Sequence, residues 1–193
     1  MVVTDIGFAP IRHIDGMTTE TLTIRAASVA DAPVLAWFGS TTFMATYAGQ
    51  VPDDALSEYV SRAFTSDQMS AEITNDSMRV LIAESGRAVI GYAVLRSSAA
   101  PGFVPGDDPL ELGRIYVSFA AQGQGVGSHL FASSLEHARA TGHDWIWLTV
   151  WERNPKAIAA YQRWGFAQVG AVRFPFGDEI HRDLVLARKV DQP

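Results

Sequence analysis

The feature of this sequence that most restricts its fold is a strand that leads into a glycine-rich turn and then into a helix. A strand is expected over Leu110–Val117 and a helix over Gly127–Thr141, and the segment Gln122-Gly123-Gln124-Gly125-Val126-Gly127-Ser128 precedes and opens that helix. Glycine lets backbone N–H groups approach an anion closely, and a helix N-terminus adds unpaired donors and a partial positive charge. The turn is therefore predicted to bind phosphate groups. The alternative is a plain flexible connection, for which three alternating glycines would be costly.

The spacing of these glycines excludes two other nucleotide-binding signatures. They stand at positions 123, 125 and 127, which does not fit the G-x-G-x-x-G pattern of dinucleotide-binding domains. The turn also lacks the Gly-Lys-Ser/Thr sequence of a Walker A loop.

Strands and helices alternate regularly only in the second half of the chain. The expected order is strand, helix, helix, three strands, helix, strand, helix and two strands. The strands are expected over 22–25, 79–84, 88–95, 110–117, 145–151, 167–174 and 183–186. Two helices are expected to start after residues 31 and 54, and two more are expected over 127–141 and 155–164. This order predicts an α/β (α+β) protein with a central twisted mixed sheet of about six to seven strands and helices on both faces, rather than a doubly wound parallel sheet.

Length and composition narrow the class of protein. At roughly 100–200 residues per domain, 193 residues predict one domain over 21–193, preceded by an N-terminal arm over 1–20 that contains breaker residues. The net charge of −6 argues against nucleic-acid binding. It also suits a cationic substrate, although solubility alone is the simpler explanation. The chain has no cysteine, no apolar run of about 18 residues and no cluster with metal-ligand spacing, so we expect a cytoplasmic protein without membrane contact or bound metal.

Two separate motifs resemble those of one enzyme family. The pattern Gln122-x-x-Gly125-x-Gly127 resembles the acyl-CoA signature Q/R-x-x-G-x-G/A of the GNAT N-acetyltransferases, and the block from Trp147 to Phe166 is similar to the downstream GNAT motif. The resemblance covers about residues 21–190. It implies the GNAT fold, acetyl-CoA as co-substrate and transfer of the acetyl group to an amine. Segments such as Thr42–Tyr47 and Leu110–Val117 further resemble the bacterial polyamine (spermidine/spermine) N-acetyltransferase branch.

The resemblance also implies which residues bind the cofactor. The loop residues Gln122, Gly123, Gln124, Gly125, Val126, Gly127 and Ser128 would bind the pyrophosphate. A bulge would splay the strand at Ile115, Tyr116 and Val117, whose exposed edge would pair with the pantetheine arm and whose N–H groups would stabilise the thioester oxyanion.

Asn154 and Tyr161 each have two interpretations. Asn154 precedes Pro155 and can simply cap the next helix, although the resemblance implies that it also contacts the CoA arm. Tyr161 falls on the buried face of that helix and could be a core residue. In the resembled family the matching tyrosine protonates the departing thiolate, which is chemistry that a phenol can perform. The resemblance therefore implies that Tyr161 is the general acid.

A base must also take a proton from the acceptor, because an alkylammonium has no lone pair for attack. Glu111, on the strand leading to the loop, is the candidate, and the alternative is an ordinary strand carboxylate. His181 could face the cleft from a late strand but shows no partner in the sequence. The acceptor pocket is expected from Trp37–Tyr47, the second helix and the loop Ser97–Asp108.

The sequence thus predicts an acetyl-CoA-dependent N-acetyltransferase that is a monomer or a homodimer. The expected acceptor is a small primary amine, and the closer resemblance implies a polyamine. Two alternatives stay open. One is an acetyltransferase of protein N-terminal or other amino groups, and the other is a non-catalytic module that only binds acyl-CoA. Acidic residues at the start of the second helix, Asp53, Asp54 and Glu58, could attract a polyamine, or they could form an ordinary solvated helix start.

Overall fold

The computed structural model describes residues 21–191, so the predicted N-terminal arm over 1–20 lies outside the described residues. In the described part, one sheet has the strand order β1-β2-β3-β4-β5-β7-β6. Its strands are β1 (Leu22–Ala26), β2 (Met78–Ser85), β3 (Ala88–Arg96), β4 (Leu110–Val117), β5 (Trp145–Trp151), β6 (Ala167–Phe176) and β7 (Glu179–Lys189). The helices are α1 (Ala32–Tyr47), α2 (Asp53–Ala63), α3 (Ser66–Thr74), α4 (Val126–Ala140) and α5 (Pro155–Arg163), with short 3-10 turns η1 (Val29–Asp31) and η2 (Phe119–Ala121).

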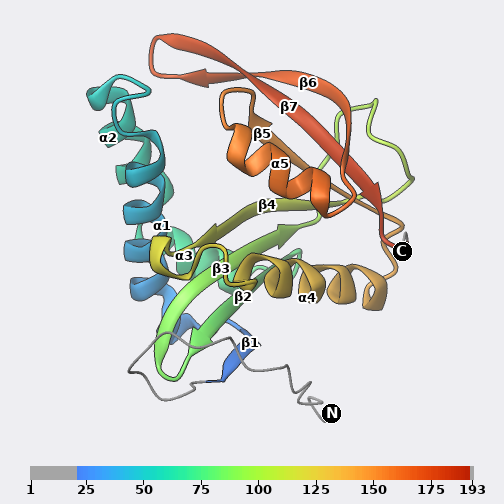
Figure 1. Cartoon of the computed structure of the whole chain (residues 1–193), viewed down its shortest axis with the longest axis horizontal. Coiled ribbons are helices and arrows are strands. Elements are labelled where there is room, and N and C mark those ends of the chain that lie inside the picture. The colour runs from blue at the N-terminus through green and yellow to red at the C-terminus, as the bar shows by residue number, and fades with distance from the viewer. Residues whose placement is uncertain (1–20, 192–193) are drawn as a thin grey trace.

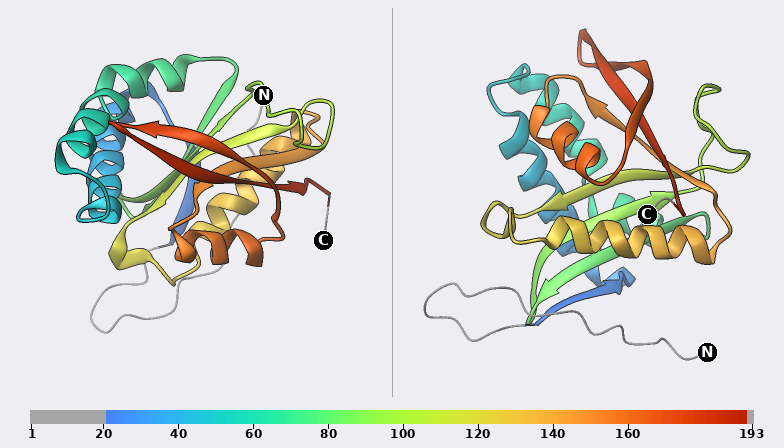
Figure 2. Two further views of the ribbon diagram at one scale, coloured as in Figure 1. Left: turned by 90° about the horizontal axis from the view of Figure 1, so that it is seen from above. Right: turned by 45° about the vertical axis from the view of Figure 1, so that its right-hand side comes forward.

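Helices cover both faces of this sheet, as the sequence predicts. Helices α4 and α5 lie on one face, and α1 and α3 pack on the other (Figures 1 and 2). All neighbouring strands are antiparallel except β4 and β5, which are parallel. The predicted mixed α/β fold is confirmed.

Strand β2 shows why the central strands need cover on both faces. Its alternating residues point in opposite directions. Leu81 and Ala83 join the core beneath α4, whereas Val80 and Ile82 join the core beneath α1 and α3. All four side chains are buried, so neither face of this part of the sheet is left to solvent.

Helix α3 is absent from the order that the sequence predicts. Thr65 caps it by accepting a hydrogen bond from the backbone N–H of Gln68 at 3.0 Å. Met69 is fully buried, and Glu72 pairs with Arg114 of β4 at 2.6 Å. The helix is only nine residues long and turns few apolar side chains inward, so tertiary contacts stabilise it more than any local pattern does.

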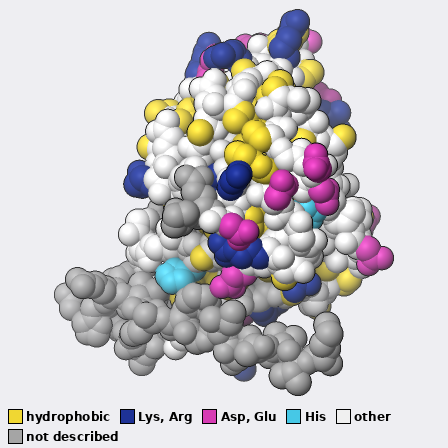
Figure 3. Space-filling view, turned by 90° about the vertical axis from the view of Figure 1, so that its right-hand side faces the viewer, with side chains coloured by type: hydrophobic (Ala, Val, Ile, Leu, Met, Phe, Trp, Pro, Cys, Tyr) yellow, Lys and Arg dark blue, Asp and Glu magenta, His cyan; other side chains and the backbone are white. Residues whose placement is uncertain are grey.

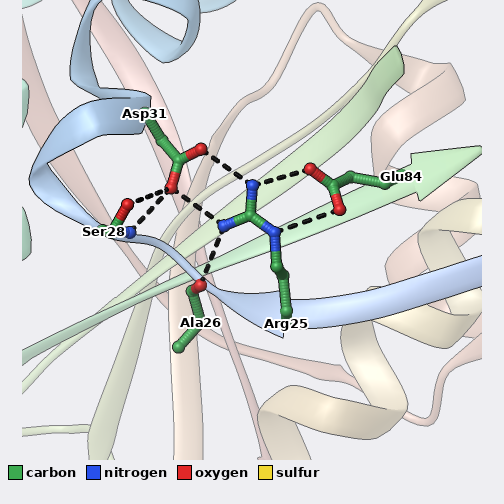
Figure 4. A network of polar contacts seen from close by, with 5 residues as sticks. All are labelled: Arg25, Ala26, Ser28, Asp31 and Glu84. Atoms are coloured by element: carbon green, nitrogen blue, oxygen red, sulfur yellow. Dashed lines mark hydrogen bonds and ion pairs between the residues drawn. The ribbon is translucent and has the colours of Figure 1, made fainter. Parts of the chain in front are cut away.

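An ion-pair network fastens β1, which lies at one edge of the sheet, to its neighbours (Figure 4). The Arg25 guanidinium donates to both oxygens of Asp31, each at 2.8 Å, and to both oxygens of Glu84 on β2, at 2.6 and 3.0 Å. Asp31 also accepts from the backbone N–H of Ser28 at 2.7 Å, the contact expected of a capping residue. The adjacent guanidinium holds the pKa of Asp31 well below its usual value.

Strands β4 and β5 separate almost as soon as they meet. They pair only at Leu110 with Ile146 and at Glu111 with Trp147. On the other side of β4, the register with β3 shifts at Gly113, which is a bulge. A bulge in this strand is as expected, although it lies two residues before Ile115. The separation leaves the later halves of β4 and β5 unpaired with each other.

The β6–β7 hairpin reaches across the molecule and approaches α2 (Figures 1 and 2). At its tip Gly177 has a φ of 58°, and a Cβ there would lie 2.7 Å from the Cβ of Ala55. A larger residue would therefore push the hairpin away from α2. Strand β7 extends well beyond the predicted 183–186 because it pairs along its length with both β5 and β6.

Figure 3 shows the charged and hydrophobic side chains on one face of the molecule. Acidic and basic side chains lie next to one another there, beside a group of hydrophobic side chains (Figure 3). The described part of this face has no broad basic field of the kind that nucleic acid requires. Within residues 21–191, no helix combines the length and the apolar character that crossing a membrane requires.

We expect Leu130→Ala to lower the free energy of unfolding by about 2–5 kcal/mol, because it removes a fully buried side chain of α4 from the core. Chemical denaturation measures this change. Glu136→Ala, on the exposed side of the same helix, is the matched control and should change stability by less than about 0.5 kcal/mol. Equal effects of the two variants would contradict the assigned core.

Candidate active site

A cavity of about 860 Å³ occupies the region where β4 and β5 separate. Its walls include Ile115–Val117 of β4, Thr149–Trp151 of β5, the glycine-rich loop and residues of α5 and α1. The cavity therefore joins the predicted cofactor side to a second side beneath α1 and the β6–β7 hairpin. One cavity thus contains both the expected cofactor site and the expected acceptor site.

The glycine-rich loop forms the N-terminus of α4. Gly123 and Gly125 have φ angles of 79° and 86°, and Gly125 is the N-cap residue. These left-handed conformations suit glycine and turn the backbone toward the helix start. Helix α4 begins at Val126, one residue before the predicted start. The predicted strand–turn–helix geometry is present, and phosphate binding by this turn stays a prediction.

The side chain of Gln122 connects this loop to its surroundings. It donates to the carbonyl oxygen of Val117 at 3.1 Å and accepts from Lys156 of α5 at 2.5 Å. Gln122 thus holds the loop between β4 and α5, which gives this signature residue a structural function. Lys156 lines the cavity as well and brings a positive charge to the loop.

The remaining loop residues divide into two groups. Gly123, Gly127 and Ser128 line the cavity, whereas Val126 is buried in the core and Gln124 donates to the carbonyl oxygen of Ala120 at 2.7 Å. Gln124 and Val126 do not line the cavity, so a cofactor contact by either residue stays a prediction. The sequence patterns did not single out Trp164, which donates to the Ser128 hydroxyl at 3.2 Å and would lie 3.3 Å from a Cβ at Gly127.

Asn154 lines the cavity and also caps α5. Its Oδ1 accepts from the backbone N–H of Ala157 at 3.1 Å, so the capping interpretation is confirmed. It also makes a polar contact with Tyr47 of α1, where burial raises the pKa of the phenol. The contact with the CoA arm stays a prediction, and capping does not prevent it.

Tyr161 also lines the cavity, from α5. Its ring packs edge-on against Trp164 and Phe166, with centroid distances of 5.7 and 5.8 Å. Burial raises the pKa of its hydroxyl above the usual value. Tyr161 therefore stays protonated at neutral pH and can donate a proton, so the core interpretation and the acid interpretation are compatible.

Glu111 lies outside the cavity wall. Its carboxylate accepts from Arg96 at 2.6 and 2.7 Å and from the Ser98 hydroxyl at 2.5 Å, and the residue is buried. Arg96, in contrast, lines the cavity and passes Gly113 at a distance that leaves little room for a larger residue there. The geometry offers Glu111 no direct contact with a reacting amine.

The second side of the cavity is formed by aromatic rings from four separate elements. We call it the aromatic compartment, and its members are Phe43, Tyr47, Tyr59, Trp151, Phe174 and Phe176. The rings of Phe43 and Tyr59 stack at 4.9 Å, and Tyr47 lies 5.6 Å from Trp151. Sequence reasoning identified the parts of this wall that come from α1 and from the second helix, α2, but missed the contribution of β5 and β6.

Asp183 of β7 lines the cavity beside this compartment. Among the described lining residues it is the only acidic one, and the basic ones are Arg96, Arg114, Arg153, Lys156 and Arg163. Burial raises the pKa of Asp183, an effect that the nearby His181 opposes. The only sequence signal for Asp183 was its two-residue spacing from His181, which places both on one face of a strand.

Two expected parts of the acceptor pocket lie elsewhere. In the described structure, the loop Ser97–Asp108 does not line the cavity. Its Val104 packs instead against β5 and β7, in a cluster with Trp147, Val185 and Ala187. Trp37 is 65% exposed. The acidic residues Asp53, Asp54 and Glu58 are exposed on α2, as the solvated-helix interpretation expects.

Comparison with known proteins identifies the family. A sequence model of the acetyltransferase (GNAT) family matches residues 43–166. The chain belongs to the GNAT family of acetyltransferases. The match includes the glycine-rich loop, the cavity walls of β4 and β5, and α5.

Individual relatives agree with this assignment. An uncharacterized N-acetyltransferase of Lactobacillus delbrueckii subsp. lactis is 25% identical over 161 residues, covering 83% of this chain and 93% of the relative. The PaiA N-acetyltransferase of Thermoplasma acidophilum, solved with coenzyme A, superimposes with a TM-score of 0.73 at 20% identity, over 88% of this chain and 99% of that one. Salmonella typhimurium yncA, solved with acetyl-CoA, gives 0.68 at 19% identity, over 90% and 96% of the two chains.

The predicted GNAT fold and the predicted enzyme class, an acetyl-CoA-dependent N-acetyltransferase, are confirmed. The narrower resemblance to the polyamine branch is not confirmed. Within the described residues, no three His, Asp or Glu side chains lie together in a way that could hold a metal ion.

We expect Gly125→Glu to weaken binding of CoA at least about 100-fold. The new carboxylate would lie next to the negatively charged pyrophosphate, and like charges brought together cost several kcal/mol. Isothermal titration calorimetry measures the affinity. Gly142→Glu is the matched control, since Gly142 has nearly the same φ, 85°, at the opposite end of α4 with open space around it. If both variants bind CoA as the parent does, the loop is not the pyrophosphate site.

Proposed function

We propose that this GNAT enzyme transfers the acetyl group of acetyl-CoA directly to a primary amine, whose ammonium group first binds at Asp183. The observation that carries the proposal is a single cavity with the glycine-rich loop on one side and an aromatic compartment with one carboxylate on the other.

The proposed cofactor position follows from the unpaired strand edge. The pyrophosphate would lie on the backbone N–H groups of the loop Gln122–Ser128 at the N-terminus of α4. The pantetheine arm would pair with β4 at Ile115–Val117, where β5 has diverged and leaves backbone groups without a strand partner. Lys156 and Arg163 of α5 line the same cavity and would balance phosphate charge.

Chemistry would take place between the two sides of the cavity. The amine nitrogen attacks the thioester carbonyl, a β4 N–H stabilises the oxyanion, and Tyr161 protonates the departing thiolate. The protonated state of Tyr161 supports this function, because burial raises the pKa of its hydroxyl. Glu111 as the base stays a prediction. Its double contact with Arg96 supports a positioning function for it instead.

The aromatic compartment supports a particular kind of acceptor. Aromatic faces attract cations, and a half-buried carboxylate such as Asp183 can form a strong charge-assisted hydrogen bond with an ammonium. One ammonium carried on an apolar group would satisfy both features. A polyamine would bring several positive charges to a cavity whose described lining has one acidic and five basic side chains.

The polyamine preference thus stays a prediction that this charge balance does not support. Acetylation of protein N-terminal or other amino groups is the second candidate. The alternative of a non-catalytic acyl-CoA-binding module is not supported, because the matching family is one of acetyltransferases. The predicted cytoplasmic location and the monomeric or homodimeric state also stay predictions.

A panel of acceptors separates these possibilities. Thiol release from acetyl-CoA is measured with 2-phenylethylamine, spermidine, free amino acids and short peptides. We expect the fastest turnover with the aromatic monoamine. Faster turnover with spermidine would restore the polyamine assignment, and faster turnover with peptides would favour the second candidate. Failure of every amine to release thiol would refute the proposed direct transfer to a primary amine.

We expect Tyr161→Phe to lower kcat about 10²–10⁴-fold, because it removes only the hydroxyl that protonates the thiolate. Thiol-release kinetics measure the change, and CoA affinity should be unaltered. Tyr59→Phe offers a matched control on the acceptor side, where loss of a hydroxyl should leave kcat within about tenfold of the parent. A normal kcat in Tyr161→Phe would return this residue to a core function.

We expect Asp183→Asn to raise KM for a cationic amine about 10–100-fold, because a hydrogen bond to a charged group contributes about 1.5–3 kcal/mol. Burial raises the folded pKa of Asp183, so acidification protonates it earlier than a solvated aspartate. In the parent, KM should therefore rise as the pH falls from neutral toward that raised pKa, and this rise should be absent in the variant.

Asp178→Asn is the control for this experiment, because Asp178 lies exposed at the hairpin turn outside the cavity wall. It should leave KM unchanged. An unchanged KM in Asp183→Asn would refute the proposed ammonium site.

A further inference from the structure

We propose that His181 is the base that removes the proton from the acceptor ammonium, and that Glu179 positions it. This inference rests on the proposed function above. His181 lines the same cavity as Asp183 and stands two positions before it on β7, so both side chains lie on one face of that strand.

Aromatic contacts fix the plane of the imidazole. It stacks on Trp151 of β5 with a centroid distance of 5.1 Å and an interplanar angle of 15°. It also stacks on Phe176 of β6 at 5.5 Å and 20°. The side chain is only 12% exposed, although it borders the cavity. A base held in this way needs little reorganisation to meet an amine in the aromatic compartment.

A carboxylate fixes the tautomer. Nε2 of His181 lies 2.8 Å from a carboxylate oxygen of Glu179. An ionised carboxylate can only accept a hydrogen bond, so Nε2 carries the proton and the lone pair is on Nδ1. Within residues 21–191, Nδ1 has no hydrogen-bond partner. A base oriented by a third group is the arrangement that catalytic sites use to activate proton transfer.

Charged groups of β7 and of the turn after β5 lie near the imidazole. Glu179 and Asp183 on β7 both supply negative charge, and the carboxylate of Glu152 after β5 is balanced by Arg182 at 2.8 Å. Arg153 lies over the Trp151 ring, 5.8 Å from its centroid. The carboxylates near His181 on its own strand are therefore Glu179, which contacts the ring, and Asp183, two positions further along.

Other groups on the acceptor side are weaker bases. The phenols of Tyr47 and Tyr59 have raised pKa values because of burial, so they stay protonated. Asp183 is a carboxylate, which is ordinarily a weaker base than an imidazole, and its negative charge is used to bind the ammonium. Glu111 does not reach the cavity. His181 is left as the group suited to deprotonation.

The proton transfers balance in three steps. Nδ1 of His181 takes one proton from the ammonium and leaves a neutral amine. The amine lone pair forms the C–N bond at the thioester carbonyl, and the C–S bond then breaks as Tyr161 gives its proton to the sulfur. The nitrogen loses its second proton in that collapse, which restores the Tyr161 hydroxyl. One proton is released in total, through His181 to solvent.

Two acceptors of similar shape test this assignment. 2-Phenylethylamine is protonated at neutral pH and needs the base, whereas O-benzylhydroxylamine is already unprotonated and does not. For His181→Gln we expect kcat with 2-phenylethylamine to fall about 10²–10⁴-fold, while kcat with O-benzylhydroxylamine falls less than about tenfold. Glu179→Gln keeps a hydrogen-bonding group but removes the charge, and we expect a smaller loss with the same dependence on the acceptor.

His143→Gln is the matched control. Its Nδ1 also faces a carboxylate, that of Asp108 at 3.2 Å, but the residue lies outside the cavity wall, and turnover of both acceptors should be unchanged. Calorimetry with CoA confirms that each variant is folded. Equal losses with both acceptors in His181→Gln would indicate a structural residue and overturn the proposal, as would no loss with either. If the parent enzyme itself acetylates no amine, the proposed function fails and this inference fails with it.

Discussion

The separation of β4 from β5 is the constraint on which the rest of this structure depends. Two residue pairs join the strands, and beyond them each strand presents backbone donors and acceptors that the other does not satisfy. The bulge at Gly113 bends β4 away, and the space between the strands becomes the cavity. A sheet paired along its full length would have no room for a thioester between its strands.

The elements around the opening keep it from closing. On one face, α4 and α5 are joined to β4 through the Gln122 side chain and to each other through Trp164. On the other face, α1 and α3 are held by the buried cores of β2 and β3 and by the ion pair of Glu72 with Arg114. Because both faces are packed, the facing edges of β4 and β5 stay open toward the cavity.

The two sides of the cavity differ in the side chains that line them, and each set of side chains suits a different substrate. The cofactor side combines a helix N-terminus with basic residues, which suits phosphate. The acceptor side combines aromatic rings with Asp183 and His181, which suits an ammonium that must lose a proton. Tyr161 lies on α5 with a hydroxyl that burial keeps protonated. The proposed acid, Tyr161, and the proposed base, His181, thus lie on different elements that line one cavity.

The sequence by itself determined the cofactor side, including the strand over 110–117, the glycine-rich turn and the capped helix that carries Tyr161. These features are local, because turn geometry and helix capping depend on residues close together in the chain. Only the tertiary structure decided the acceptor side. Helix α3 forms mainly through tertiary packing, and β7 is long because it lies between two partners. His181 gains its carboxylate, its ring contacts and its place beside Asp183 from strands that are brought together by pairing, and strand pairing between distant segments leaves no local signal in the sequence.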